Sequence, residues 1–527
     1  MKRLVLCSSF FAMVFLASCG GNGSGNTPPP PSGNFSNASL NGQYAFSMSG
    51  VEAKTGAFAA QIGSFAADGN GNITSGLEDV LNLSTAAPPS LLTFSDGTYQ
   101  IDSNGRGLIK LNITGGGSLQ LSVSLISNTQ GYVVQTDGAA ATTGSLNLQT
   151  PSAFSAASIN GKYVFDVSGI SFAGPTPSII SQIGQFTGDG NGNITGGVTD
   201  INDGSFAPTG AVPVEVATYQ LDTNGNGTNF GRGTLTLNGK NYAFYIVNST
   251  RISLLEEDDA GGSQGYAVLQ SGAIPGQNSD VNGSFVFQTG GRVTGGDFGP
   301  IARLGRMAAD GAGAIGSIAF DENDDGHNTH ISASSKLSNA NYAMDASNPG
   351  SGRGTFTFQN SSIGTISYVF YFYSPTRAVI QDVSTGVVSD GTMLAQATGP
   401  FTTSTVAGNY IFNWSGVQII NPSPFEEEFV GQAAQTSTSS NNFSGATDFV
   451  ELGLSSTTSG VTLNSSISGT LTINADGTQD NPFKIAVGGS SGFTVNFKAY
   501  IADNSNILLI CYDGDRTTTG VQTQQTQ

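Results

Sequence analysis

The stretch that decides the fold is GQYAF at residues 42–46, because three more copies of it occur along the chain. The other copies are GKYVF at 161–165, GSFVF at 283–287 and GNYIF at 408–412. In the first copy, Tyr44, Phe46 and Met48 alternate with polar or small residues. A period of two is typical of a β-strand with one buried face. The sequence therefore predicts four related β units.

The ends of the units also repeat. A small pair follows each opening, and each unit closes on a Gly placed five residues before a Gln. The pairs are Ser49-Gly50, Ser168-Gly169, Thr289-Gly290 and Ser415-Gly416, and the closing segments are Gly144 to Gln149, Gly265 to Gln270, Gly391 to Gln396 and Gly520 to Gln525. Each unit is as long as a small domain and far longer than a solenoid repeat. We therefore divide the chain into β repeats over 37–150, 155–271, 277–397 and 402–527, the last being divergent.

The first unit is expected to contain eight strands, separated by turns rich in Gly and Asn such as 68–72. We place the strands at about 42–50, 57–67, 72–83, 97–102, 106–114, 118–127, 131–136 and 144–149. Short connections favour antiparallel neighbours, and eight strands suit an up-and-down barrel whose last strand pairs with its first. We therefore predict an all-β chain of four tandem eight-stranded up-and-down β-barrels. Two-sheet β-sandwich domains are the alternative.

The opening motif and the hairpins at 63–69 and 184–190 resemble the first strands of avidin- and lipocalin-like barrels. The resemblance covers about a third of each unit and implies calycin-like barrels. Biotin recognition in avidins uses several Trp residues. Trp414 is the one Trp of this chain, so the resemblance does not imply biotin binding.

The N-terminal sequence predicts that the protein is located in the cell envelope. Lys2 and Arg3 precede an apolar stretch at 4–16 that is too short to span a membrane, and residues 1–18 match a secretory signal peptide. Leu16-Ala17-Ser18-Cys19 resembles the lipobox of bacterial lipoproteins. The resemblance implies cleavage before Cys19, lipidation of its thiol and acylation of its new amino group, with palmitate expected among the chains. An ordinary signal peptide with a chance Cys is the alternative.

A Gly- and Pro-rich tether over 19–36 separates the lipid anchor from the first repeat. Its Gly-rich part is flexible, and Pro28 to Pro31 form a stiffer spacer. In lipoproteins an Asp after the lipidated Cys favours retention in the inner membrane. Gly20 stands there, so we expect the outer membrane, on a face that the sequence leaves open.

Composition excludes one class of partner. Asp and Glu number 37 against 18 Lys and Arg, and a net charge of -19 repels nucleic acid. Cys7 leaves with the signal peptide and Cys19 carries lipid, so Cys511 is the remaining thiol and is expected to be buried.

Arg106, Arg232 and Arg353 each stand before a Gly at the start of a fifth strand, and we match them with Ser468 in the fourth unit. One interpretation is a ligand site in which the Arg binds an anion at the barrel mouth. The other is a structural Arg that bonds carbonyls or the Asp of a preceding Tyr-x-x-Asp motif. We favour the structural role.

Calcium is a weak possibility, and no other cofactor is expected. Asp321, Asn323 and Asp325 match the first half of an EF-hand loop, but Ser332 stands where a Glu is required. An ordinary hydrophilic hairpin is the favoured interpretation. His327 and His330 flank this segment and suit a transition metal, although solvated side chains are the simpler reading.

Acidic pairs are the remaining candidates for catalysis, because the chain holds only two His residues. Glu78 with Asp79, Asp200 with Asp203 and Asp321 with Glu322 recur at one place, where an exposed strand end is the favoured interpretation. The acidic runs 256–259 and 426–428 are predicted to be solvated loops.

The function that we predict is that of a non-enzymatic cell-envelope lipoprotein. It is held at the membrane by its lipid anchor and presents tandem β domains to an unknown protein, glycan or small-molecule ligand. One alternative is a small-molecule carrier with cavities inside the barrels. Another is a glycan-acting enzyme that uses paired carboxylates.

Overall fold

The structure is a computed structural model of the chain. It describes residues 33–83, 89–172, 177–204, 208–223, 227, 229–258, 261–294, 299–419, 424–435, 441–453, 459–489 and 492–526. The predicted signal peptide, Cys19 and most of the tether lie outside these residues. Within them, no helix has the length and hydropathy needed to cross a membrane. Short 3-10 helices precede the opening strands: η1 (Asn37–Ser39), η2 (Pro151–Ala153), η3 (Ala156–Ser158), η4 (Asn278–Asp280) and η5 (Thr403–Val406).

Unit one is a closed antiparallel barrel. Its strands are β1 (Asn41–Glu52), β2 (Phe58–Asp68), β3 (Asn72–Asn82), β4 (Ser90–Ile101), β5 (Arg106–Ile113), β6 (Ser118–Ser127), β7 (Gln130–Gln135) and β8 (Ala140–Leu148). Each strand pairs with the next, and β8 pairs with β1. The predicted all-β fold of eight-stranded up-and-down barrels is confirmed, and a β-sandwich does not form.

Unit four is a closed barrel of the same topology. Its strands are β27 (Gly408–Gln418), β28 (Phe425–Gln435), β29 (Asn442–Gly453), β30 (Ser459–Thr470), β31 (Phe483–Val487), β32 (Phe493–Ile501), β33 (Asn506–Cys511) and β34 (Arg516–Gln524). Cys511 is buried, as the apolar sequence around it predicts.

Units two and three keep this order but divide the fourth strand into two short ones. Unit two contains β9 (Asn160–Ser171), β10 (Ser178–Asp189), β11 (Asn193–Asn202), β12 (Thr209–Pro213), β13 (Ala217–Leu221), β14 (Arg232–Leu237), β15 (Lys240–Asn248), β16 (Arg251–Glu256) and β17 (Gly261–Leu269). Unit three contains β18 (Asn282–Val293), β19 (Pro300–Asp310), β20 (Ile315–Asp324), β21 (His327–Ile331), β22 (Ser338–Met344), β23 (Arg353–Asn360), β24 (Gly364–Ser374), β25 (Arg377–Asp382) and β26 (Val387–Ala395). In unit three, an isolated bridge joins Ala314, just before β20, to Asn341 of β22.

Aromatic side chains of the opening strands fill the barrel interiors. Phe46 lies opposite Gly63 on the neighbouring strand, and a Cβ on Gly63 would lie 2.5 Å from the Phe46 ring. The same Phe–Gly pairing recurs in the other units, as Phe165–Gly184, Phe287–Gly305 and Phe412–Gly431. A cavity of only about 30 Å³ is found inside unit four, beside Tyr410 and Phe483. That volume suits a single water rather than an organic ligand.

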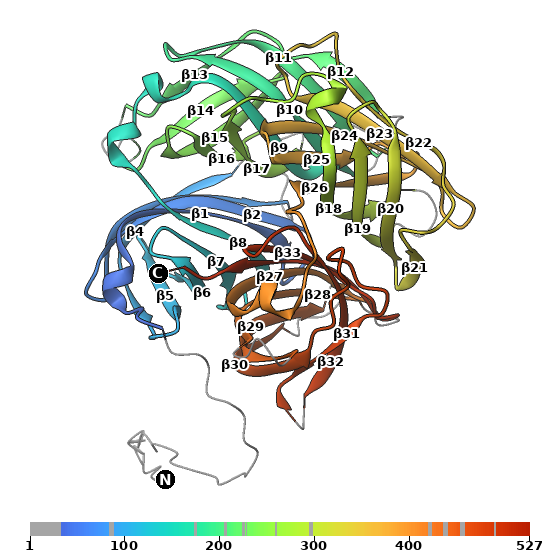
Figure 1. The fold of residues 1–527 in the computed structure, drawn as a ribbon. Coiled ribbons are helices and arrows are strands. Elements are labelled where there is room, and N and C mark those ends of the chain that lie inside the picture. The colour runs from blue at the N-terminus through green and yellow to red at the C-terminus, as the bar shows by residue number, and fades with distance from the viewer. Residues whose placement is uncertain are drawn as a thin grey trace, which may run out of the picture.

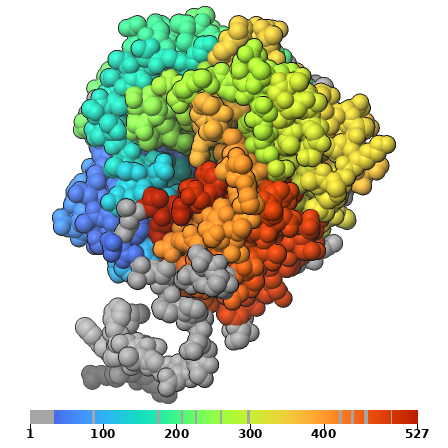
Figure 2. Space-filling view, in the orientation of Figure 1, coloured from blue at the N-terminus to red at the C-terminus, as the bar shows by residue number. Residues whose placement is uncertain are grey.

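The four units close into a ring (Figure 1). Apolar side chains pack each unit against the next, and the last unit packs against the first. Residues that share one buried cluster are Ile62 and Tyr245 (units one and two), Ile183 and Tyr371 (two and three), Leu304 and Tyr500 (three and four), and Val450 and Val134 (four and one). The space-filling view shows the four units packed around one centre (Figure 2). The opening strands β1, β9, β18 and β27 meet there.

Candidate functional site

The recurring Arg residues lie at the joints between barrels. Arg232 of unit two binds Asp79 of unit one, with Nη2 and Oδ1 2.7 Å apart. Arg353 of unit three binds Asp200 of unit two at 2.7 Å. Arg106 of unit one binds Asp448 of unit four at 2.6 Å, which closes the ring.

The fourth joint uses a different cation. Asp321 of unit three binds Lys498 of β32, with Oδ1 and Nζ 2.7 Å apart. The position equivalent to the three Arg residues is Thr478, because its carbonyl accepts a backbone hydrogen bond from Asn474, as the Arg106 carbonyl does from Asp102. The match with Ser468 made from the sequence is therefore wrong.

Each interface carboxylate also accepts a hydrogen bond from a buried hydroxyl group. Tyr245, Tyr371 and Tyr500 donate to Asp79, Asp200 and Asp321, over distances of 2.8, 2.5 and 2.6 Å. At the joint between units four and one, Ser122 takes this role and donates to Asp448. Burial raises the pKa of all three Tyr hydroxyls, which keeps them protonated as donors. Each of these carboxylates therefore binds a cation and a hydroxyl donor of the neighbouring unit, which links the units around the ring.

The segment that resembles an EF-hand does not fit calcium. Asp321 and Asn323 lie within strand β20 instead of a loop. The carboxylate of Asp321 is occupied by Lys498, Tyr500 and His330, and the Asn323 amide donates to the carbonyls of Cys511 and Arg516. In the described part of the chain, no three His, Cys, Asp or Glu side chains are grouped to hold a metal ion.

The paired acids do not face one substrate. Glu78 and Asp79 are neighbours in β3, so their side chains point to opposite faces of the sheet. Asp79 points to the joint, whereas Glu78 points away from it. Both residues are buried, and burial raises the pKa of the Glu78 carboxyl to about 8. Asp321 and Glu322 divide in the same way, since Glu322 binds Arg303 while Asp321 binds Lys498. Asp203 lies beyond the end of β11.

The closing Gln of each unit also belongs to the joints. The amide of Gln149 donates to the carbonyls of Phe230 and Ile246 in unit two, over 3.0 and 2.7 Å. Gln270 and Gln396 make the same two bonds to the unit that follows them. Gln525 makes them to Asn104 and Leu125 of unit one, over 2.9 and 2.8 Å. The Gln that closes each repeat therefore links that unit to the next one around the ring.

The small pairs line a cavity of about 610 Å³ where the four units meet. Ser49-Gly50, Ser168-Gly169 and Ser415-Gly416 belong to its wall. In unit three the equivalent pair is Gly290-Gly291 rather than Thr289-Gly290, because Thr289 lies opposite Gly391 as Met48 lies opposite Gly144. Small residues there leave room that larger side chains would fill.

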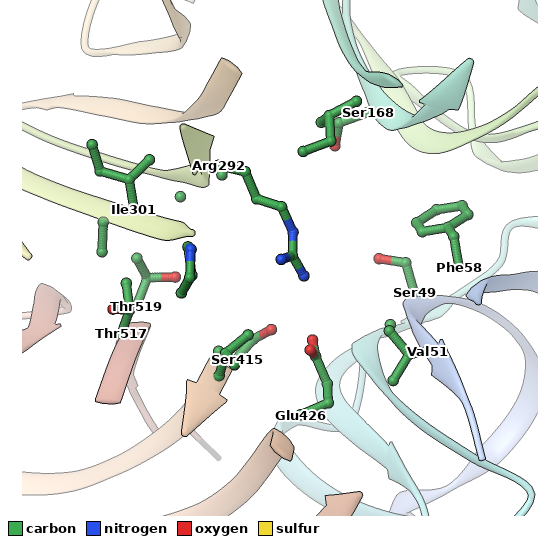
Figure 3. A pocket seen from close by; sticks show the side chains of 18 of the residues that line it. Ser49, Val51, Phe58, Ser168, Arg292, Ile301, Ser415, Glu426, Thr517 and Thr519 are labelled. Carbon is green, nitrogen blue, oxygen red and sulfur yellow. The ribbon is translucent and has the colours of Figure 1, made fainter. Parts of the chain in front are cut away.

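Charged side chains enter this cavity from units three and four. Arg292, Asp390, Glu426 and Glu428 belong to its lining, and Arg292 and Glu426 extend into the same space (Figure 3). The prediction of a solvated loop at 426–428 is wrong, because these residues lie in β28 and all three are buried. Burial raises the pKa of Glu426 to about 7 and that of Asp390 to about 6.

Much of the remaining wall is apolar. Val51 and Phe58 come from unit one, and Ile170 and Ile179 come from unit two. A cavity of this size, with an apolar wall and a few converging polar groups, is typical of a site for a small organic molecule. Neither Arg292 nor Glu426 was predicted from the sequence to be a binding residue. The sequence does hold a signal for Arg292, because alignment of the four openings places it where the other units have Val or Ile.

Comparison with known proteins gives little guidance. No family model and no curated protein matches the sequence. Among solved structures, a tryptophan-to-alanine mutant of Transferrin Binding Protein B (TbpB) from Haemophilus parasuis Hp5 has a TM-score of 0.19 and 10% identity, over 76% of this chain and 83% of that one. Isotype 1 TbpB from serogroup B Neisseria meningitidis has a TM-score of 0.21 and 8% identity, over 75% and 83%. At such TM-scores the arrangements differ, and the likeness supports no argument about function.

Proposed function

We propose that this protein is a non-enzymatic, lipid-anchored binding protein of the cell envelope, and that it holds a small amphipathic molecule in its central cavity. The observation that carries the proposal is the cavity itself, which has an apolar wall interrupted by charged groups. The four domains over 37–150, 155–271, 277–397 and 402–527 form its wall. The described barrel interiors are packed with aromatic residues, so the cavity between the barrels is the better candidate for a ligand site.

The test of ligand binding uses the full-length protein in detergent and a small-molecule library read by thermal shift. Ser49→Trp places a large side chain in the cavity and is expected to abolish binding of any hit. Ser361→Trp, on an exposed turn of unit three, is the matched control. A hit that still binds the Ser49→Trp variant, or a library that yields no hit, contradicts the proposal.

The anchor is tested separately. Cys19→Ser removes the residue that the lipobox motif assigns for lipidation. We expect this variant to remain in the aqueous phase of a detergent partition, whereas the parent protein enters the detergent phase, because multiple acyl chains give stable membrane attachment. Separation of inner and outer membranes then tests the expected outer-membrane location. Equal partition of both proteins would count against lipid anchoring.

A further inference from the structure

The cavity wall is built from four equivalent pairs of residues. The end of each opening strand pairs with the start of the next strand. In each unit, the residue directly after the small pair lies opposite one residue of that next strand. These pairs are Val51–Phe58 in unit one, Ile170–Ile179 in unit two, Arg292–Pro300 in unit three and Val417–Glu426 in unit four. All eight residues line the cavity. The repeat thus places apolar residues at these positions, and only Arg292 and Glu426 depart from the rule.

These two departures face the same space. The side chains of Arg292 and Glu426 converge from units three and four, as Figure 3 shows. Within the described residues, however, no ion pair joins them, and the Oε2 atom of Glu426 is buried without a hydrogen-bond partner. Glu426 is 9% exposed. A buried charge without a partner costs free energy, so the pair is unexplained by the fold alone.

Units one and two supply the opposite side of the cavity. Val51, Phe58, Ile170 and Ile179 form an apolar surface there. Glu428 of unit four and Asp390 of unit three add carboxyl groups to the lining. The cavity therefore combines apolar side chains from units one and two with Arg292 and Glu426, two opposite charges from units three and four.

We propose that the central cavity binds a zwitterionic ligand with an apolar body, of the size of an amino acid or a short peptide. Its ammonium group binds Glu426, its carboxylate binds Arg292, and its apolar side chains pack on Val51, Phe58 and Ile170. This inference rests on the proposed function and specifies the class of ligand. Ion pairing of both ends gives the buried Oε2 atom of Glu426 a partner and brings an anion to Arg292.

The test uses one apolar body in four charge states. The probes are leucyl-leucine, its N-acetyl derivative, its C-terminal amide and the N-acetyl amide. Calorimetry with the full-length protein in detergent measures each affinity. We expect leucyl-leucine to bind best, and loss of either charge to weaken binding about 10- to 100-fold, the effect of a hydrogen bond between charged groups.

Two variants assign the ends of the ligand. Glu426→Gln is expected to remove the preference for a free ammonium group, and Arg292→Gln the preference for a free carboxylate. Arg377→Gln and Glu215→Gln, both at exposed positions, are matched controls expected to bind all four probes like the parent. Circular dichroism melting confirms that each variant is folded. If either cavity variant unfolds, the order of the four affinities in the parent protein still decides the ligand class.

The outcomes separate the ligand class from the function. Equal binding of the neutral and the zwitterionic probe, or an equal loss of all four probes in both cavity variants, overturns the proposed ligand class. Binding of none of the probes also overturns it. In either case, a different hit from the library that Ser49→Trp excludes would leave the proposed function standing.

Discussion

Loss of one buried ion pair should open the ring at the joint between units four and one. Arg106 and Asp448 are joined over 2.6 Å, and their side chains are 7% and 5% exposed. In Arg106→Met, Asp448 keeps donors from Ser122 and from the Asn464 backbone but loses its cation. Breaking a buried pair on one side costs about 3–5 kcal/mol. The two remaining donors place the expected loss near the lower end, at about 3 kcal/mol.

Urea unfolding followed by Trp414 fluorescence measures this loss, because Trp414 lies inside unit four. With a slope of about 1–3 kcal/mol/M, the midpoint should fall by at least about 1 M. Small-angle X-ray scattering should show a larger radius of gyration, since no peptide segment connects these two units directly. Arg106→Met combined with Asp448→Leu removes both charges and should recover much of the loss. An unchanged midpoint in the single variant, or a double variant no more stable than the single one, would refute the reasoning.

Three further predictions follow from the same geometry. Gln525→Ala removes two hydrogen bonds to unit one and should lower stability by about 1–3 kcal/mol in urea unfolding, while Gln100→Ala, at an exposed position, should leave stability nearly unchanged. Gly265→Ala places a Cβ 1.8 Å from the Asp166 carbonyl oxygen and should lower the melting temperature. Gly276→Ala is the control, because its Cβ would meet no atom within 4 Å. Equal melting temperatures of the two variants would contradict the tight approach of β17 to β9. Burial raises the pKa of Asp390 from 3.8 to about 6 and that of Glu426 from 4.5 to about 7, with Arg292 opposing and Glu427 adding to the shift of Glu426. The stabilising contribution of these two groups is thus complete below about pH 4 and is lost as the pH rises through 6 to 7. The melting temperature of the parent protein should therefore fall between pH 5 and 8, and that of Glu426→Gln should fall less. A melting temperature of the parent protein that does not change over this pH range would be inconsistent with these pKa shifts.

The fold of each unit could be read from the sequence because its signals are local. Alternation at Tyr44, Phe46 and Met48 matches one buried face of β1, and the Gly- and Asn-rich turn at 68–72 matches the connection between β2 and β3. Pairing of neighbouring strands followed from the short connections. The errors lie at strand ends: β4 begins at Ser90 rather than near residue 97, and β8 begins at Ala140 rather than near residue 144.

The sequence by itself determined four antiparallel barrel or barrel-like units and the repetition of an Arg, a carboxylate and a closing Gln. The tertiary structure alone decided what these repeats do, because their partners belong to other units. Arg232 meets Asp79 at a separation of 153 residues, and Arg106 meets Asp448 at 342. Such contacts depend on how the curved outer faces of the barrels pack, which no local period records. The same packing buries Glu426 beside Arg292, so an acidic run typical of a solvated loop becomes part of a cavity wall.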